Sequence, residues 1–355
     1  MSKIIERLEQ NQFTLIAEIG VNYYDIAAER GISPLDAARL MIREAAAAGV
    51  HAVKFQSYKA ETLASKDSPA YWDRSEEPTD SQYKLFQKFD SFGEEEYGSL
   101  KACADECNVE FLSTAFDFAS ADYLDSMMEV YKISSSDLSN LPFIAYQARK
   151  EKPILLSVGA SNLDEIHRAV DTIKQYNNKK ITLLHCVLEY PTPYEDANLL
   201  KIASLKKEFP DCYIGYSDHT KPTEDCDVIK TAYNLGAVLV EKHFTLNKEL
   251  KGNDHYHAMD PEDVKRILEG IDYLDLIRGR GDLKSLDTEL QARKQARRSI
   301  VAACHIAKDT IIKEEMLTFK RPGTGISPAD MGKILGSSAR MDIAEDTVLS
   351  YEMIK

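Results

Sequence analysis

The sequence lacks the features that mark several large classes of protein. No uninterrupted apolar run reaches the roughly 20 residues that a membrane-spanning helix requires, so we predict no membrane span. The N-terminal segment MSKIIERLEQNQ carries charges of both signs and has no apolar core typical of a secretion signal, so we expect a cytoplasmic protein. The six cysteines form no CxxC pair of the kind that binds zinc or performs redox chemistry, and we interpret them as reduced, buried apolar residues.

Positive charge is also scarce. The chain has 44 lysines and arginines against 58 aspartates and glutamates, which gives a formal net charge of −14 at pH 7. This surplus of negative charge disfavours binding to nucleic acid. Any anionic ligand must therefore meet a few lysines or arginines that are concentrated in one cleft.

Eight apolar segments of strand-like character recur along the chain, mostly separated by stretches of helical period such as DEIHRAVDTIKQY. The 355 residues accommodate a barrel of about 250 residues and one small additional module. A doubly wound sheet would carry a glycine-rich phosphate-binding turn after its first strand, and EIGVNYYD is not such a turn. We therefore predict an α/β fold, a (β/α)8 TIM barrel, with strands within residues 13–20, 50–58, 109–116, 130–136, 153–159, 180–186, 212–218 and 236–245.

Two connections stand out from this alternation. The one after the second strand, residues 59–93, is long and polar, and long connections of this kind usually serve the active face of a barrel. The second, residues 284–297, is charged and helical, and it links the predicted barrel domain, residues 1–283, to a tail without the alternating pattern, residues 298–355.

The tail contains an internal sequence repeat. IAKDTIIKEEM, residues 306–316, and IAEDTVLSYEM, residues 343–353, match at six of eleven positions. The repeated D-T-apolar-apolar turn chemistry predicts a small, pseudo-symmetric, β-rich module. A purely structural role is the simplest interpretation of this repeat.

Lysines occur at the ends of predicted strands, where a barrel performs its chemistry. Lys54 and Gln56 are two residues apart and share one face of the second strand. A lysine within an apolar strand requires a counter-charge, and an internal ion pair with Glu18 would explain Lys54 without any ligand. Lys132 occupies the same kind of place on the fourth strand, however, and two such lysines favour an anionic ligand. Three residues at strand ends add hydroxyl groups suited to phosphate or carboxylate oxygens: Thr114, Ser135 and Ser157.

Two histidines follow neighbouring strands. Glu241 and His243 are co-facial on the eighth strand, while Lys242 between them points the other way. His219, just after the seventh strand, is within reach of His243. A lone histidine is more often structural, but two imidazoles with carboxylates nearby suit a divalent transition metal such as manganese and leave coordination positions open.

Several of these segments together resemble the N-acetylneuraminate (sialic acid) synthase family of bacteria. The segments, in chain order, are AEIGVN, AVKFQSY, LSTAFD, YKISSSD, YPTPYED, GYSDHT, EKHFTL and KRPGTGIS. The resemblance implies a (β/α)8 barrel followed by a small antifreeze-like (SAF) domain, assembled as a domain-swapped homodimer. It also implies that phosphoenolpyruvate condenses with N-acetylmannosamine or a close analogue, with Mn²⁺, or alternatively Mg²⁺ or Co²⁺, as the metal cofactor.

Carried over by position, the resemblance assigns roles to thirteen residues. It implies that Glu18, a proton-transfer acid, acts with Lys54 and Lys132 in catalysis, and that His219 and His243 bind the metal. In KRPGTGIS, Pro322 stiffens the chain after Arg321, and the two glycines permit a tight approach to another surface. The implied phosphoenolpyruvate contacts are Lys54, Thr114, Lys132, Ser135 and Ser157, and the implied sugar contacts are Gln56, Tyr190, Glu241, Asp254 and Arg321.

The chain departs from the family pattern at Tyr23, where histidine is frequent, and at Val187 and Leu188, where asparagine or threonine often occurs. In residues 252–261, GNDHYHAMDP replaces the commoner glycine-proline-aspartate start. These departures concern recognition of the sugar. The alternative acceptors are the diacetamido sugar that leads to N,N'-diacetyllegionaminic acid and a keto-deoxy sugar phosphate. Two further interpretations remain: a pyruvate lyase that uses Lys132 as a Schiff base, and a non-catalytic sugar-binding protein.

Overall fold

The computed structural model describes residues 2–72, 74–252 and 254–355, and it forms two compact units, Met1–Arg278 and Gly279–Lys355. The division comes at the end of the last helix of the first unit, a few residues before residue 284. Every helix in the described part of the chain is too short or too polar to cross a bilayer.

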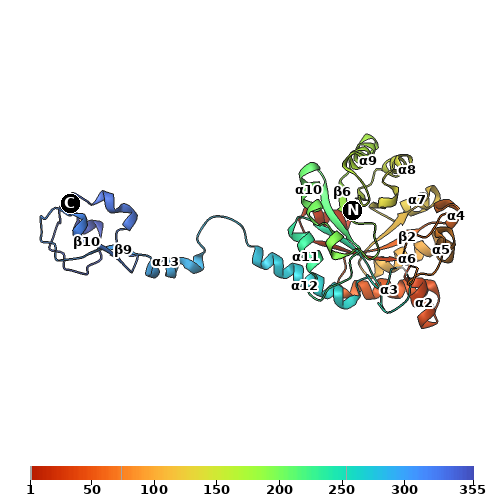
Figure 1. The fold of residues 1–355 in the computed structure, drawn as a ribbon, viewed down its shortest axis with the longest axis horizontal. Coiled ribbons are helices and arrows are strands. Elements are labelled where there is room, and N and C mark those ends of the chain that lie inside the picture. Colours follow the sequence, from red (N-terminus) through yellow and green to blue (C-terminus); the bar gives the residue numbers. More distant parts are fainter. Residues whose placement is uncertain (1, 73, 253) are drawn as a thin grey trace. The chain divides into compact units, whose positions relative to one another are not determined.

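The first unit is a closed barrel of eight parallel strands in sequence order, as the sequence predicts (Figure 1). Each predicted segment contains one strand, and each observed strand is shorter than its predicted segment. The strands are β1 (Thr14–Gly20), β2 (Ala52–Ser57), β3 (Glu110–Ala115), β4 (Tyr131–Ile133), β5 (Ile154–Ser157), β6 (Ile181–His185), β7 (Tyr213–Asp218) and β8 (Leu239–His243).

A helix packs outside the barrel between each pair of successive strands. In α9, a reciprocal cap joins Asn162 and Glu165, and the buried residues Ile166, Val170 and Ile173 repeat at helical spacing, so local chemistry and packing agree. The connecting helices are α3 (Pro34–Ala48), α6 (Glu94–Glu106), α7 (Phe118–Asp125), α8 (Leu141–Ala148), α9 (Leu163–Tyr176), α10 (Leu200–Glu208) and α11 (Asp227–Asn234), and α12 (Pro261–Arg278) follows β8. Three more helices lie in the connections after β1 and β2: α2 (Tyr23–Arg30), α4 (Ala60–Leu63) and α5 (Gln82–Lys88).

The N-terminal helix α1 (Lys3–Glu9) closes the end of the barrel at which the strands begin. Its Ile4 and Leu8 are buried against the inward-facing layer that includes Ile16 and Ala52. The carboxylate of Glu110, the first residue of β3, accepts hydrogen bonds from Ile4 N (2.8 Å) and from the Ser2 hydroxyl (2.7 Å). This apolar seal leaves the opposite mouth of the barrel for polar chemistry.

The second unit has its own isoleucine-rich core. Helix α13 (Leu290–Ala296) precedes the antiparallel strands β9 (Ser299–Ala302) and β10 (Leu317–Lys320). Only these two short strands are regular among the described residues, so most of the module is held by isolated bridges and 3-10 turns. The core residues are Ile300, Ala302, Ile306, Ile312, Ile326, Ile334, Ala339, Ile343, Leu349 and Ile354.

The internal sequence repeat corresponds to a structural pseudo-symmetry. Ile306 and Ile343 exchange two backbone hydrogen bonds of 2.9 and 2.8 Å. Asp309 and Asp346, at equivalent positions of the two repeats, both adopt the left-handed conformation, with φ of 63° and 65°. The structure therefore confirms that the two segments form matching halves of one module.

Candidate active site

A polar cavity of about 400 Å³ opens at the ends of the barrel strands. Because successive parallel strands end at the same mouth, side chains far apart in sequence converge there. All five predicted phosphoenolpyruvate contacts line this cavity, together with Glu18, Gln56, Tyr190, Glu241 and both predicted metal histidines. The full lining is Glu18, Lys54, Gln56, Thr114, Phe116, Lys132, Ser134, Ser135, Ser157, Cys186, Leu188, Tyr190, Ser217, His219, Glu241 and His243.

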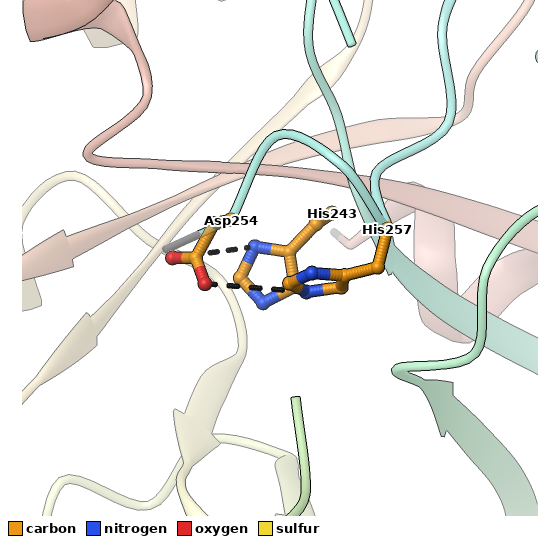
Figure 2. Close-up of side chains that lie close together, drawn as sticks. All are labelled: His243, Asp254 and His257. Atoms are coloured by element: carbon orange, nitrogen blue, oxygen red, sulfur yellow. Dashed lines mark ion pairs between the residues drawn. The ribbon is translucent and has the colours of Figure 1, made fainter. Parts of the chain in front are cut away.

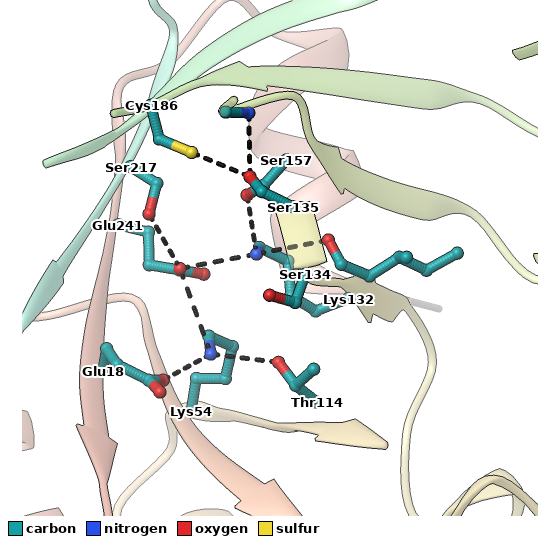
Figure 3. Close-up of polar contacts among 12 residues, drawn as sticks. Glu18, Lys54, Thr114, Lys132, Ser134, Ser135, Ser157, Cys186, Ser217 and Glu241 are labelled. Atoms are coloured by element: carbon teal, nitrogen blue, oxygen red, sulfur yellow. Dashed lines mark hydrogen bonds and ion pairs between the residues drawn. The ribbon is translucent and has the colours of Figure 1, made fainter. Parts of the chain in front are cut away.

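Two buried lysines and two buried carboxylates form the floor of the cavity (Figure 3). The Lys54 ammonium lies 2.6 Å from Glu18 Oε2 and 3.9 Å from Glu241 Oε1. The Lys132 ammonium lies 3.5 Å from the same Glu241 oxygen and donates to Ser157 Oγ at 2.8 Å. Glu241 thus joins the two lysines into one network.

The structure contains the ion pair between Lys54 and Glu18 that would explain this buried lysine without any ligand. The same ammonium also donates to Thr114 Oγ1 at 3.1 Å and lines the cavity. Gln56 donates to the other oxygen of Glu18 at 2.9 Å and thereby orients the carboxylate. The ion pair and a ligand-facing position therefore coexist.

Burial and charge shift the pKa values of this network in different directions. Burial raises the pKa of Glu18 to about 7, although Lys54 opposes the shift. Burial also lowers the pKa of Lys132, and Glu241 offsets only part of that effect. For Lys54 and Glu241 burial is the largest influence, but opposite charges outweigh it: the pKa of Lys54 is raised and that of Glu241 is lowered.

One wall of the cavity is built for close approach. Ser135, the first residue of the 3-10 turn after β4, accepts a hydrogen bond from Gly159 N at 2.8 Å and contacts Cys186 Sγ at 2.9 Å. A Cβ atom at Gly159 would lie 2.6 Å from Cys186 Sγ and 3.0 Å from Ser135 Oγ. The backbone can therefore reach these side chains only because residue 159 is glycine.

His243, Asp254 and His257 form a cluster at the rim of the cavity (Figure 2). One potential ligand atom from each lies within 4.8 Å of the other two. His243 Nδ1 is 3.8 Å from Asp254 Oδ2, and His257 Nε2 is 4.0 Å from Asp254 Oδ1. Among the described residues, neither His243 Nδ1 nor either nitrogen of His257 has a hydrogen-bond partner. Nitrogen lone pairs and a carboxylate oxygen at this spacing fit a divalent ion.

His219 lies beside this cluster. Its Nδ1 donates to the Val187 carbonyl at 2.6 Å, which leaves the lone pair on Nε2. Its ring centroid is 5.8 Å from that of His243 and 6.4 Å from that of His257. Burial lowers the pKa of His219 to about 4 and those of His243 and His257 well below the ordinary value. Three neutral imidazoles at neutral pH are in the form that binds metals.

A larger cavity, of about 1600 Å³, lies outside the first. Its walls include Tyr71, Phe86 and Phe89, so the connection between residues 59 and 93 lies at the same mouth of the barrel as the inner cavity. The predicted sugar contacts Gln56, Tyr190 and Asp254 line this outer cavity, whereas Glu241 lines the inner one. The two cavities adjoin, because six residues line both: Gln56, Phe116, Ser134, Leu188, Tyr190 and His243.

Arg321, the remaining predicted sugar contact, belongs to the second unit and is exposed. The structure accounts for both glycines of its motif within that unit. A Cβ atom at Gly323 would lie 2.7 Å from the Cβ of Arg297, and one at Gly325 would collide with the Leu349 carbonyl. These two glycines therefore allow a close approach within their own module. A contact with another surface is not needed to explain them.

Two other predictions require correction. The cysteines are not uniformly buried: Cys304 is exposed, and Cys107 and Cys212 are half-buried, although all six are free. Tyr23, taken as a departure that affects the sugar, stacks on Tyr24 and on Phe92 and lines neither cavity.

Sequence reasoning missed several residues of the site, among them Cys186, Ser217 and His257. Cys186 and Ser217 stand at the ends of β6 and β7, and Ser217 donates to Glu241 at 3.1 Å, so strand counting could have identified both. His257 lies in the irregular segment after β8, where no periodicity indicates the direction of a side chain.

Comparisons with known proteins agree with this architecture. The NeuB family matches residues 41–282, and the SAF domain matches residues 297–355. The N,N'-diacetyllegionaminic acid synthases of Legionella pneumophila and Campylobacter jejuni are 35% and 36% identical; the alignments cover 96% and 94% of this chain and 94% and 98% of theirs. The solved N-acetylneuraminic acid (sialic acid) synthetase of Leptospira borgpetersenii is 30% identical, with a TM-score of 0.68 over 79% of this chain and 90% of that one.

Proposed function

Because this chain belongs to the NeuB family and ends in a SAF domain, we propose that it is a transferase that condenses phosphoenolpyruvate with an amino-sugar aldehyde and water. The products are a sialic-acid-type nonulosonic acid and phosphate. The observation that carries the proposal is the pair of buried lysines, Lys54 and Lys132, in a polar cavity that opens beside a histidine cluster.

The inner cavity suits phosphoenolpyruvate. Its phosphate and carboxylate are both anionic, and the two ammonium groups at the floor of the cavity can pair with them. Ser135, Ser157 and Thr114 add hydroxyl donors around the lysines. These donors are held by the barrel before the ligand arrives, so little reorganisation accompanies binding.

The histidine cluster lies where the two cavities meet, since His243 lines both. We assign the metal to His219 and His243, with Asp254 within reach of His243. A divalent ion bound there would polarise the aldehyde oxygen of the open-chain sugar. The sugar then occupies the outer cavity with its aldehyde directed toward the inner one.

The reaction forms one carbon–carbon bond and breaks one carbon–oxygen bond. Carbon 3 of phosphoenolpyruvate attacks the aldehyde carbon, and positive charge develops at carbon 2. Water adds at carbon 2, and the bond between carbon 2 and the bridging oxygen then breaks to release phosphate and leave a keto group. Forming the keto group removes both protons of the added water: one is delivered to the former aldehyde oxygen and the other to the departing phosphate, so the protons balance. Glu18, with its pKa raised by burial to about 7, is placed to carry one of these protons.

For the acceptor, the diacetamido sugar is favoured over N-acetylmannosamine by two observations. Two relatives at 35–36% identity are named N,N'-diacetyllegionaminic acid synthases. The outer cavity is also large and has apolar walls from Tyr58, Phe86, Phe89 and Phe116, which can bury the methyl group of a second acetamido substituent.

The test is a panel of acceptors with phosphoenolpyruvate and added Mn²⁺. Phosphate release and the mass of the product are measured with N-acetylmannosamine, its 6-phosphate, and the 2,4-diacetamido-trideoxy hexose. We expect stoichiometric phosphate and nonulosonic acid, fastest with the diacetamido sugar. Folded enzyme that binds phosphoenolpyruvate but condenses it with none of these sugars would reject the proposal.

A further inference from the structure

His257 differs from most other histidines of the chain in its hydrogen bonding. It is completely buried, and neither of its ring nitrogens has a partner among the described residues. By contrast, His255, two residues earlier and equally buried, bonds to Thr245 through Nδ1 (2.8 Å) and to Asp25 through Nε2 (3.2 Å). Buried polar atoms in folded proteins are almost always paired, so an imidazole whose two nitrogens have no partner among the described residues is available to a bound ion.

The surroundings of His257 specify the kind of partner. Its ring centroid lies 5.0 Å from that of His243, whose Nδ1 is also unpaired, and the carboxylate of Asp254 faces both rings. Ligand atoms of the three residues lie within 4.8 Å of one another. Two imidazoles and a carboxylate around one point are donors for a divalent metal ion.

The fold holds His257 in place without its own side chain. On one side, Met259 N donates to His243 O at 2.7 Å and Thr245 N donates to Met259 O at 3.0 Å, which ties the segment to the end of β8. On the other side, the His255 bonds fix the start of the segment, and the Tyr256 hydroxyl donates to Tyr190 O at 3.0 Å. The imidazole is therefore presented to the cluster by a rigid segment, as a preorganised ligand requires.

We propose that His257 is a third imidazole ligand of the catalytic metal, completing a site of His219, His243, His257 and Asp254. This inference rests on the proposed function, because it concerns the same metal. A third imidazole and a carboxylate raise the number of protein donors, so the protein retains its ion more tightly than a site of two histidines would. Fewer positions are then left for water and for the sugar aldehyde.

The first test measures metal binding directly, without turnover. Chelator-stripped protein is titrated with Mn²⁺, and free Mn²⁺ is followed by electron paramagnetic resonance. We expect His257→Ala to weaken binding by at least about tenfold, the size of effect found even for groups that only orient ligands. His167→Ala, a surface histidine paired with Glu208, is the matched control and should bind like the unmodified protein.

The second test asks whether residue 257 touches the ion. His257→Cys loaded with Co²⁺ should show the intense near-ultraviolet charge-transfer absorption of a thiolate–cobalt bond. The unmodified protein and His167→Cys, loaded in the same way, should lack it. Mn²⁺ should also raise the melting temperature of the unmodified protein more than that of His257→Ala, because stabilisation by a ligand increases with its affinity.

These outcomes separate the inference from the proposed function. Unmodified protein that binds no divalent ion would overturn both the inference and the metal-dependent mechanism. Binding that is unchanged in His257→Ala, with no charge-transfer band in His257→Cys, would overturn the inference alone. A His257→Ala variant that binds Mn²⁺ normally but has a raised Michaelis constant for the sugar would assign the imidazole to the sugar instead.

Discussion

Glu18 lies where three influences on a carboxyl group meet. Burial is the largest and raises its pKa, the Lys54 ammonium 2.6 Å away lowers it, and the nearby carboxylate of Glu241 raises it again. The balance is a pKa of about 7. A group that is half-protonated near neutral pH can both accept and return a proton within one catalytic cycle, which is the role proposed for Glu18.

This balance predicts a pH dependence of activity. The proposed base form of Glu18 is lost as the pH falls through about 7, so kcat/KM should decline on the acid side of that value. Glu18→Gln should lower kcat by about 100-fold or more and abolish this step in the profile. The substrate's own ionisation persists in the variant and serves as the control. A Glu18→Gln profile with an unchanged acid limb would assign that limb to another group.

The stability contributed by Glu18 has the opposite dependence on pH. Because its pKa is higher in the folded protein than the ordinary value of 4.5, the folded state binds the proton more tightly than the unfolded chain. The corresponding stability is present at acid pH and is lost as the pH rises from about 4.5 through about 7. Activity and stability therefore favour opposite sides of the same titration.

Residue-level prediction succeeded where the two-residue period of a strand applies. Lys54 and Gln56, and likewise Glu241 and His243, face the cavity because side chains two apart on a strand share a face. The same rule correctly placed Lys242 outside, where it pairs with Asp218 at 2.7 Å. His257 could not be placed in this way, because backbone and side-chain hydrogen bonds to β8, Asp25 and Tyr190 fix its segment.

At the scale of elements, the eight strands could be predicted because buried parallel strands are nearly continuous apolar runs. The connections could not. Residues 59–93 were expected to serve the active face, but the aromatic wall formed by Tyr71, Phe86 and Phe89 depends on how α4, α5 and the irregular parts pack against the mouth. Sequence periodicity contains no information on that packing.

The turn after β5 provides a test at this scale. Gly159→Ala places a methyl group 2.6 Å from Cys186 Sγ and 3.0 Å from Ser135 Oγ, so the proposed phosphoenolpyruvate wall must shift. Overpacking of this kind costs about 1–3 kcal/mol, and we expect binding of phosphoenolpyruvate, measured by calorimetry, to weaken accordingly. The double variant Gly159→Ala, Cys186→Ala should recover part of the loss because it removes the nearest atom. Unchanged binding in the single variant would show that this wall does not contact phosphoenolpyruvate.

At the scale of the whole molecule, the sequence predicted both units. The sequence repeat of residues 306–316 and 343–353 corresponds to a module whose two halves have matching turns and hydrogen bonds. What the sequence could not provide is the role of Arg321, because its side chain is exposed and no sequence pattern indicates what an exposed guanidinium contacts. We propose that Arg321 completes the sugar site of a partner subunit, by donating to an acetamido oxygen.

Complementation tests this arrangement. Arg321→Ala and Glu241→Ala should each be weakly active, the first through the sugar and the second through the lysine network. If each site combines the barrel of one subunit with Arg321 of the other, a mixed dimer contains one intact site, and random exchange restores about a quarter of the sites. Subunit exchange is verified with tagged chains. Exchange without recovery of activity would place Arg321 in its own subunit's site or outside any site.

The alternative interpretation, a pyruvate lyase, requires Lys132 to form a Schiff base. Burial lowers the pKa of this lysine, which is a property of Schiff-base lysines, but the ammonium is also paired with Glu241 at 3.5 Å and with Ser157. The synthase requires no covalent adduct. Borohydride in the presence of pyruvate should therefore leave Lys132 unmodified, and the peptide that contains it should keep its mass.

The most direct test of the central claim follows the oxygen that bridges carbon 2 and phosphorus in phosphoenolpyruvate. The substrate is labelled with ¹⁸O at this position and turned over with the amino sugar that the enzyme accepts. If the reaction proceeds by attack through carbon 3, addition of water and cleavage of the carbon–oxygen bond, the label leaves in the phosphate and the nonulosonic acid carries none of it. Label retained in the carbon product, or phosphate released at the same rate without sugar, would contradict the account.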